Sequence, residues 1–141
     1  MHITVRTSVR APISTVWAAY TSPDHIVQWN AASDDWHTTH ATVDLRVGGT
    51  FSSRMEAKDG SMGFDFAGTY TAIIPLRLIE YVFGDRTARV AFTEENDRVK
   101  VTVTFAAESE HSIEQQQAGW QAILDRFTRH TEALGSYRAV P

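Results

Sequence analysis

The stretch SIEQQQAGWQAILDRFTRHTEAL, residues 112–134, decides the fold because it predicts one long amphipathic helix. Ser112 and Gln115 have the spacing of a capping box at its start, and Gly135 is placed to end it. Its apolar stripe consists of Trp120, Leu124, Phe127, Thr131 and Leu134, with Ile113 and Ile123 beside them. A helix of this kind buries its stripe against a second apolar layer.

The residues before this helix predict that second layer as six consecutive strands. They are segments 39–47, 50–57, 62–74, 77–83, 86–94 and 98–108, separated by turn-forming residues. In the last segment Val99, Val101, Val103 and Phe105 alternate with polar residues. This alternation is typical of a sheet with one face exposed to water.

Residues 2–29 predict one further strand and two short helices. HITVRTSVR (2–10) alternates as a strand does, and APISTVWAAYTSP (11–23) has helical spacing after Pro12. SPDHIVQW (22–29) predicts a second helix with Ser22 as the N-cap and Pro23 at the first position. The order of elements predicts an α+β fold. We expect a curved seven-stranded antiparallel sheet to surround a long C-terminal helix, with two short helices after the first strand.

Composition narrows the class of protein. The chain has 141 residues, a net charge of −4 and no cysteine, so one domain over residues 1–141 without disulfides is expected. Its 13 basic residues are scattered, which argues against a nucleic-acid partner. There is no signal-peptide pattern and no apolar run of about 18 residues, so we expect no membrane partner and a cytoplasmic location. An exposed sheet edge is compatible with a homodimer.

Several strings in this order resemble one known family. They are SPDHIVQWNAASDDWHT, VDLRVGGTF, MEAKDGS, GFDFAGTY, IEY and GWQAILDRF, which span residues 22–127. Together they resemble the SRPBCC or START-like superfamily with its helix-grip (START/Bet v-like) fold. The closest likeness is to the bacterial branch related to the C-terminal domain of the heat-shock-protein-90 ATPase activator. The resemblance implies an apolar cavity between sheet and long helix, and it supplies no catalytic set and no cofactor.

The stretch WNAASDDWHTTH, residues 29–40, first suggests a metal site or a catalytic cluster. His37 and His40 are three residues apart, and on a strand such positions face opposite sides, so we expect no metal site here. Asp34 and Asp35 are expected to be solvated loop carboxylates rather than partners of His37 in catalysis, because no nucleophile lies nearby in sequence.

The same stretch is better explained as the rim of the cavity. Trp29 and Trp36 are then expected at its mouth, with Asn30 and His37 as the polar groups offered to a ligand. The alternative is that Trp29 packs against the first helix as ordinary core.

The string GFDFAGTY predicts an aromatic wall. Phe64, Phe66, Gly68 and Tyr70 share one strand face, opposite to Asp65, Ala67 and Thr69. Gly68 leaves a dent that either admits Trp120 or, together with Gly119, opens a pocket. Tyr81, Phe83, Val90 and Phe92 extend the wall on the following strands.

Charged and amide residues leave two alternatives open. Asp44, Arg46, Arg54 and Glu56 can form a ladder of surface charges. Arg46 can instead point inward and anchor a carboxylate. On the last helix, either Gln116 or Gln117 is expected to face the cavity.

We therefore expect a domain that binds a small apolar or aromatic ligand. Its predicted ligand-binding residues are Trp29, Asn30, Trp36, His37, Arg46, Phe64, Phe66, Gly68, Tyr70, Tyr81, Phe92, Gln116, Trp120, Ile123 and Phe127. One alternative is a cyclase, dehydratase or hydrolase that uses His37, Asp65, Tyr70 or Tyr81 as acid–base groups. Another is an interaction module that stimulates a chaperone ATPase.

Overall fold

The computed structural model describes residues 1–138, with side chains described as far as residue 134. Its elements are β1 (His2–Val9), α1 (Ile13–Thr21), α2 (Pro23–Trp29), β2 (Trp36–Val43), β3 (Thr50–Ala57), β4 (Gly63–Ile74), β5 (Leu78–Phe83), β6 (Arg86–Glu95), β7 (Arg98–Ala106) and α3 (Ile113–Arg138).

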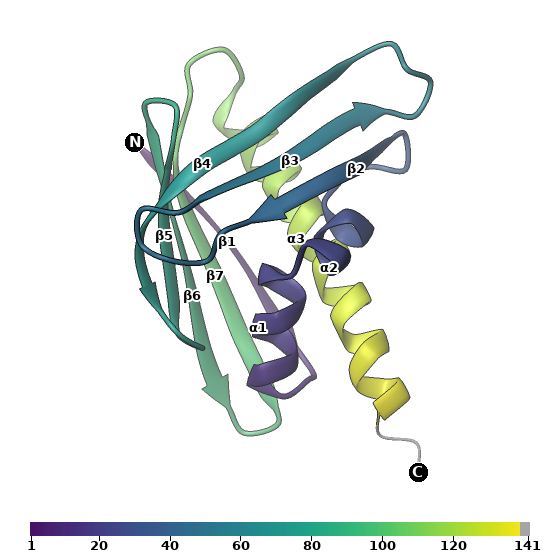
Figure 1. Cartoon of the computed structure of the whole chain (residues 1–141), viewed down its shortest axis with the longest axis vertical. Helices are drawn as coiled ribbons and strands as arrows, with labels where there is room; N and C mark the ends of the chain where they lie inside the picture. The colour runs from purple at the N-terminus through teal and green to yellow at the C-terminus, as the bar shows by residue number, and fades with distance from the viewer. Residues whose placement is uncertain (139–141) are drawn as a thin grey trace.

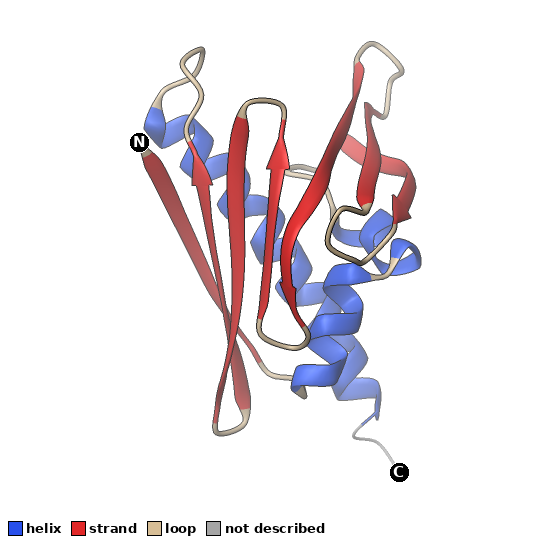
Figure 2. Cartoon of the chain, turned by 60° about the vertical axis from the view of Figure 1, so that its left-hand side comes forward, coloured by secondary structure: helices blue, strands red, loops and turns tan. Residues whose placement is uncertain are grey.

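The seven strands form one antiparallel sheet in the order β1-β7-β6-β5-β4-β3-β2. Figures 1 and 2 show that this sheet is curved and that α3 runs across its concave side, with α1 and α2 beside the helix. The predicted α+β helix-grip architecture is therefore confirmed, including the long C-terminal helix and the two short helices after β1.

The start of α3 is held by the predicted capping box. The Ser112 hydroxyl accepts a hydrogen bond from the Gln115 backbone N–H at 3.1 Å, and the Gln115 side-chain oxygen accepts one from the Ser112 N–H at 3.1 Å. The predicted end at Gly135 is wrong, because α3 continues to Arg138. Glycine weakens a helix by about 1 kcal/mol but still donates its backbone N–H, so a helix can pass through it.

Side chains of α3 also cover the sheet edge formed by β1. Gln117 donates to the Thr4 carbonyl, Gln121 bonds both backbone groups of Arg6, and Glu132 accepts from the Arg10 N–H. The predicted exposed edge is thus partly occupied at β1 by the chain itself. Gln117 lies on this edge and does not face the cavity.

β2 begins earlier than predicted and contains a bulge. The pairing with β3 shifts between Thr38 and His40, so that His37 pairs with Glu56 and His40 with Arg54. Because Glu56 and Arg54 lie two apart on one strand, their partners share a face. The expectation that His37 and His40 face opposite sides is therefore wrong, since one extra residue in the strand reverses the alternation.

Candidate functional site

A cavity of about 310 Å³ lies between α3 and the concave face of the sheet. Predicted residues among its lining are Trp29, Asn30, Phe64, Phe66, Tyr70, Tyr81, Trp120 and Ile123. Sequence reasoning missed other lining residues, chiefly Tyr20, Ile26, Phe51, Ser53, Met55 and Arg86. The volume is at the small end of the range for ligand pockets, about 300–1,000 Å³.

Aromatic rings from three neighbouring strands form the sheet side of the cavity. Phe51 of β3 lies 5.2 Å from Tyr70 of β4 and 4.9 Å from Tyr81 of β5, measured between ring centroids. Phe66 contacts Phe51 at 5.7 Å. These side chains converge because the register pairs Tyr70 directly with Tyr81, and Phe51 directly with Gly68.

Gly68 lies beneath this wall and leaves no dent. A Cβ atom at residue 68 would collide with the Val82 carbonyl oxygen and lie 2.9 Å from two ring carbons of Phe51. The two predicted alternatives, a dent filled by Trp120 and a pocket opposite Gly119, are both wrong. The ring of the directly paired residue on the neighbouring strand already covers the glycine.

α3 supplies the opposite wall through Trp120, Ile123 and Leu124. The Trp120 ring stacks on Phe105 of β7 at 3.9 Å with an interplanar angle of 9°. Its ring centroid lies 6.1 Å from that of Phe66, which also lines the cavity, and the two rings are nearly perpendicular. Trp120 is half-buried, so it packs against the core on one side and borders the cavity on the other.

The two tryptophans predicted at the mouth differ in their roles. Trp29 is only 6% exposed, and its indole N–H donates to the Ala19 carbonyl at 2.9 Å, so it belongs to the core beneath the cavity. Trp36 does not line the cavity but lies 5.9 Å from Phe64, which is 48% exposed and does line it. The prediction that Trp29 is a rim residue is therefore corrected.

Phe92 and Phe127 are core residues outside the cavity. Both are buried, and both pack edge-on against Tyr20, at 5.6 Å and 5.1 Å. Their predicted place in the lining is taken by Tyr20, whose ring lies between them and the cavity. Phe92 does point to the inner face of the sheet, as predicted, but α1 covers this part of the face through Trp17.

Of the polar residues predicted at the cavity, Asn30 does line it, but several others lie elsewhere. His37 shares the face of Glu56 and Arg54, outside the cavity. Asp65 is on this outer face as well, 3.6 Å from the Arg54 guanidinium. The expected inward Arg46 is wrong: its side chain is 74% exposed and bonds Asp44 at 2.9 Å in the turn after β2. A charged head has no reason to enter an apolar space when water and a partner are available outside.

Gln116 is buried but does not reach the cavity. Its side-chain amide donates to the carbonyls of Glu108 and His111, at 3.0 Å and 2.9 Å, and its oxygen accepts from the Glu108 N–H. The residue thus fixes the loop that precedes α3.

Three tyrosine hydroxyls border the cavity. Among the residues with described side chains, none bonds the hydroxyl of Tyr20, Tyr70 or Tyr81, and no polar side-chain atom is both fully buried and unpaired. These hydroxyls are therefore open to the cavity. Burial, with a smaller effect of Asp44, raises the pKa of Tyr70 to about 12, and burial also raises the pKa of Tyr20 and Tyr81. All three stay protonated at neutral pH and can donate a hydrogen bond.

Arg86 is the one charged residue in the cavity lining of the described chain. It starts β6 on the same face as Ala88, Val90 and Phe92, which are all buried. Its Nε donates to the Ala106 carbonyl at 3.0 Å. The signal was present in the sequence, because Arg86 lies four and six residues before Val90 and Phe92, which were assigned to the inner face.

The sequence of residues 10–132 matches the family described as Activator of Hsp90 ATPase homolog 1-like protein. This chain belongs to that family. The predicted resemblance to the SRPBCC superfamily and to this branch is confirmed. No curated protein matches the chain.

A solved structure of an AHSA1-like protein supports the assignment. The solution structure of the AHSA1-like protein from Aeromonas hydrophila has 48% sequence identity and a TM-score of 0.90, covering 96% of this chain and 94% of that protein. A protein from Cytophaga hutchinsonii has 45% identity and a TM-score of 0.81, with coverage of 94% and 92%. A protein from Nitrosomonas europaea, at 16% identity and a TM-score of 0.83 with coverage of 95% and 96%, shows the shared fold alone.

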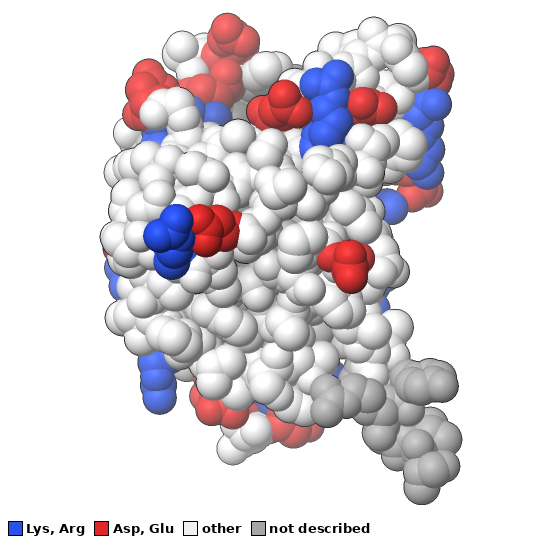
Figure 3. All heavy atoms as spheres, viewed as in Figure 1, with Lys and Arg blue, Asp and Glu red and all other residues white. Residues whose placement is uncertain are grey.

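Some of the surface charges of this AHSA1-like chain lie in ion pairs, which among the described residues are formed by Arg46, Arg54, Arg89, Arg98 and Arg126. On the face in Figure 3, acidic and basic groups lie side by side near the top and on the left, other charged groups stand alone, and a broad area between them carries no charged residue. Arg126 of α3 bonds Asp34 of the loop before β2 at 2.8 Å, which lowers the pKa of that carboxyl. Within the described part of the chain, no helix is both long enough and apolar enough to cross a membrane.

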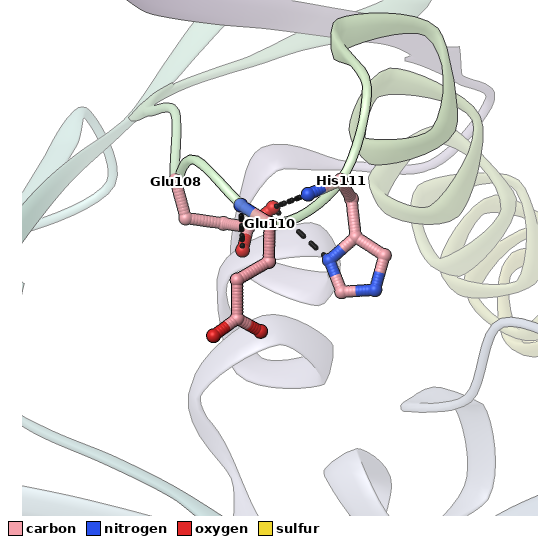
Figure 4. Close-up of side chains that lie close together, drawn as sticks. All are labelled: Glu108, Glu110 and His111. Atoms are coloured by element: carbon pink, nitrogen blue, oxygen red, sulfur yellow. Dashed lines mark hydrogen bonds and ion pairs between the residues drawn. The ribbon is translucent and has the colours of Figure 1, made fainter.

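One group of potential metal ligands occurs among the described residues, at the loop before α3. It comprises Glu108, Glu110 and His111, with ligand atoms within 4.8 Å of one another (Figure 4). The Glu108 carboxylate already accepts from the backbone N–H groups of Glu110 and His111, at 3.1 Å and 2.8 Å. This bonding gives the group a structural role in shaping the loop. None of the three residues lines the cavity.

Proposed function

We propose that this AHSA1-like chain binds a small, mainly apolar ligand in the cavity between α3 and the sheet. The cavity itself carries the proposal. Protein interiors otherwise pack with few voids larger than a water molecule. A space of about 310 Å³ inside a small fold is therefore best explained as room for a ligand. Aromatic side chains on both walls match a ligand with an apolar body.

The titratable groups in the cavity favour binding over acid–base catalysis. Within the described lining they are the three tyrosines and Arg86, and burial keeps the tyrosines protonated near neutral pH. A general base works best with a pKa near the operating pH. Two of the predicted acid–base candidates, His37 and Asp65, lie on the outer face. The tyrosines therefore serve as hydrogen-bond donors that orient a bound molecule.

Native mass spectrometry of the protein purified from its own host tests the proposal directly. We expect a retained small molecule that is lost on denaturation. Binding of the neutral fluorescent probe N-phenyl-1-naphthylamine to ligand-free protein provides an independent measurement. Failure of the folded protein both to retain a molecule and to bind the probe would contradict the proposal.

Two adjacent serines of β3 give a matched pair of variants. Ser53 is buried and lines the cavity, whereas Ser52 is one residue away and faces the opposite side of the sheet. Ser53→Leu should fill part of the cavity and weaken probe binding at least tenfold. Ser52→Leu should leave it unchanged. Equal probe binding by both variants would place the binding site elsewhere.

A further inference from the structure

Resting on the proposed function, the geometry points to a more specific ligand: an amphipathic molecule whose single anionic group, of the carboxylate type, pairs with Arg86. The proposal starts from the position of Arg86 on the sheet. In β6 the inward positions are Arg86, Ala88, Val90 and Phe92, and the last three are buried. Arg86 at the next inward position is half-buried and places a permanent positive charge at an apolar cavity wall.

The contacts of Arg86 hold its guanidinium in place and leave most of its donors free. Nε bonds the Ala106 carbonyl at 3.0 Å, and the guanidinium carbon lies 4.6 Å from the centre of the Phe83 ring. Neither contact uses the two terminal nitrogens. Among the residues with described side chains, no carboxylate forms an ion pair with Arg86, although ion pairs are formed by Arg46, Arg54, Arg89, Arg98 and Arg126.

The cavity lining of the described chain supplies no negative charge that would compensate this cation. The described lining contains no Asp or Glu, so the charge of the cavity is +1. Placing a cation in an apolar site costs free energy unless an anion meets it. The terminal nitrogens of an arginine match the two oxygens of a carboxylate, and such bidentate pairs are among the strongest hydrogen bonds in proteins.

Two buried tyrosines complete the polar end of the site. Tyr81 pairs with Ala88 on β6, two residues from Arg86 on the same face, and Tyr70 pairs with Tyr81. Both are 7% exposed, and their hydroxyls are unpaired and open to the cavity. A carboxylate on Arg86 can therefore accept a further hydrogen bond from a tyrosine, while the rings of Phe51, Phe66 and Trp120 contact the apolar body.

Two probes that differ by one anionic group test the proposal. 8-Anilino-1-naphthalenesulfonate and N-phenyl-1-naphthylamine share the same ring system, and only the first carries a negative charge. Each is titrated into ligand-free protein and into Arg86→Gln. We expect Arg86→Gln to weaken binding of the anionic probe about tenfold or more, since hydrogen bonds to charged groups carry this magnitude. Binding of the neutral probe should change less than about twofold.

Arg89→Gln is the matched control. Arg89 lies on the same strand but faces the outer side of the sheet, where it is exposed and lies 3.7 Å from Glu80. The variant therefore removes the same charge as Arg86→Gln does, but from the outer face. Both probes should bind this variant as they bind the wild type. If Arg89→Gln weakens the anionic probe as much as Arg86→Gln does, the effect is one of net charge and the inference is overturned.

The remaining outcomes separate the inference from the proposed function. If neither probe binds the wild type, the cavity does not bind ligands and both proposals fail. If both bind but Arg86→Gln changes neither, or weakens both equally, only the anionic ligand is excluded. If Arg86→Gln does not fold, the salt dependence of probe binding by the wild type tests the inference instead. The anionic probe should bind more weakly in 0.5 M than in 0.05 M NaCl while the neutral probe does not, and equal behaviour of the two overturns the inference.

Discussion

The two halves of α3 meet the same sheet in different ways. In the C-terminal half, Phe127 and Thr131 are buried, and both α1 and α2 contact the helix. In the N-terminal half, Trp120 and Ile123 are half-buried and border the cavity. Figure 1 shows the two short helices beside the middle and the C-terminal half of α3 and not beside its start. A third layer thus fills one half of the interface, and its absence from the other half leaves space for a ligand.

The largest expected difference between the halves concerns their central aromatic residues. Phe127 is 0% exposed and contacts Tyr20 and Trp29, at 5.1 Å and 5.0 Å. Phe127→Ala should lower the free energy of unfolding by about 3–5 kcal/mol, because it opens a cavity in a closed core. Trp120→Ala should cost about 1–3 kcal/mol, since part of its ring already borders a cavity. Urea unfolding measures both changes in the free energy of unfolding. Equal changes would contradict the proposed difference between the two halves of α3.

The next prediction compares a glycine of the sheet, Gly68 on β4, with a glycine of the long helix, Gly119 on α3. Gly68→Ala should destabilise the protein by about 1–3 kcal/mol, because the added Cβ collides with Val82 and crowds Phe51. Gly119→Ala should stabilise it by about 0.5–1 kcal/mol, because the added Cβ meets no atom within 4 Å beyond its chain neighbours and the backbone of its own helix, and alanine favours a helix. Thermal unfolding distinguishes the two signs. If Gly68→Ala leaves the stability unchanged, the Phe51 ring can move away from the added Cβ at little cost in free energy.

The closed parts of the fold could be predicted from sequence because they follow local rules. β3 was predicted at residues 50–57 and is found as Thr50–Ala57, since a period of two between turn-forming residues fixes both ends. The pairing of Ser112 with Gln115 was likewise visible as a spacing of three. These features depend on residues close together in the chain.

The candidate site was less predictable because it depends on pairing between strands. The bulge beside Thr38 reverses the alternation of side chains along β2, so that His37 and His40 both lie on the outer face of the sheet. No pattern within β2 reveals this bulge. The ring of Phe51 covers Gly68 only because the register pairs these two residues. Arg86 is different: its parity was readable from Val90 and Phe92, and it was overlooked because a cation is not expected on an inner face.

A smaller effect is expected at the start of α3, at the open end of the interface. Ser112→Ala removes the hydroxyl that accepts the Gln115 N–H, and should cost about 1 kcal/mol. Ser109→Ala, in the same loop and without a hydrogen bond from its side chain in the described structure, should cost a few tenths of that. Hydrogen exchange of the first turn of α3 should rise only in Ser112→Ala. Equal exchange in the two variants would show that Gln116 alone holds the helix start.

The smallest expected effect is a pH dependence of the closed half. His25 of α2 and His130 of α3 share a hydrogen bond of 2.9 Å between ring nitrogens, so at least one ring must be neutral. Burial, and then the charge of His25, lowers the pKa of His130 below its ordinary value. The unfolded chain therefore binds this proton more readily than the folded protein does. The stability contributed by the neutral ring is complete above the ordinary histidine pKa of about 6.5 and is lost as the pH falls below it.

Comparison with a variant isolates this contribution. Between about pH 7.5 and pH 5.5 the wild type should lose more free energy of unfolding than His130→Gln does, by less than about 1 kcal/mol because solvent partly screens the pair. His40→Gln, an exposed histidine on β2, should retain the wild-type dependence. Urea unfolding at both pH values measures the three proteins. If His130→Gln follows the wild-type curve, the histidine contact does not hold α2 against α3, and the closed half depends on its apolar packing alone.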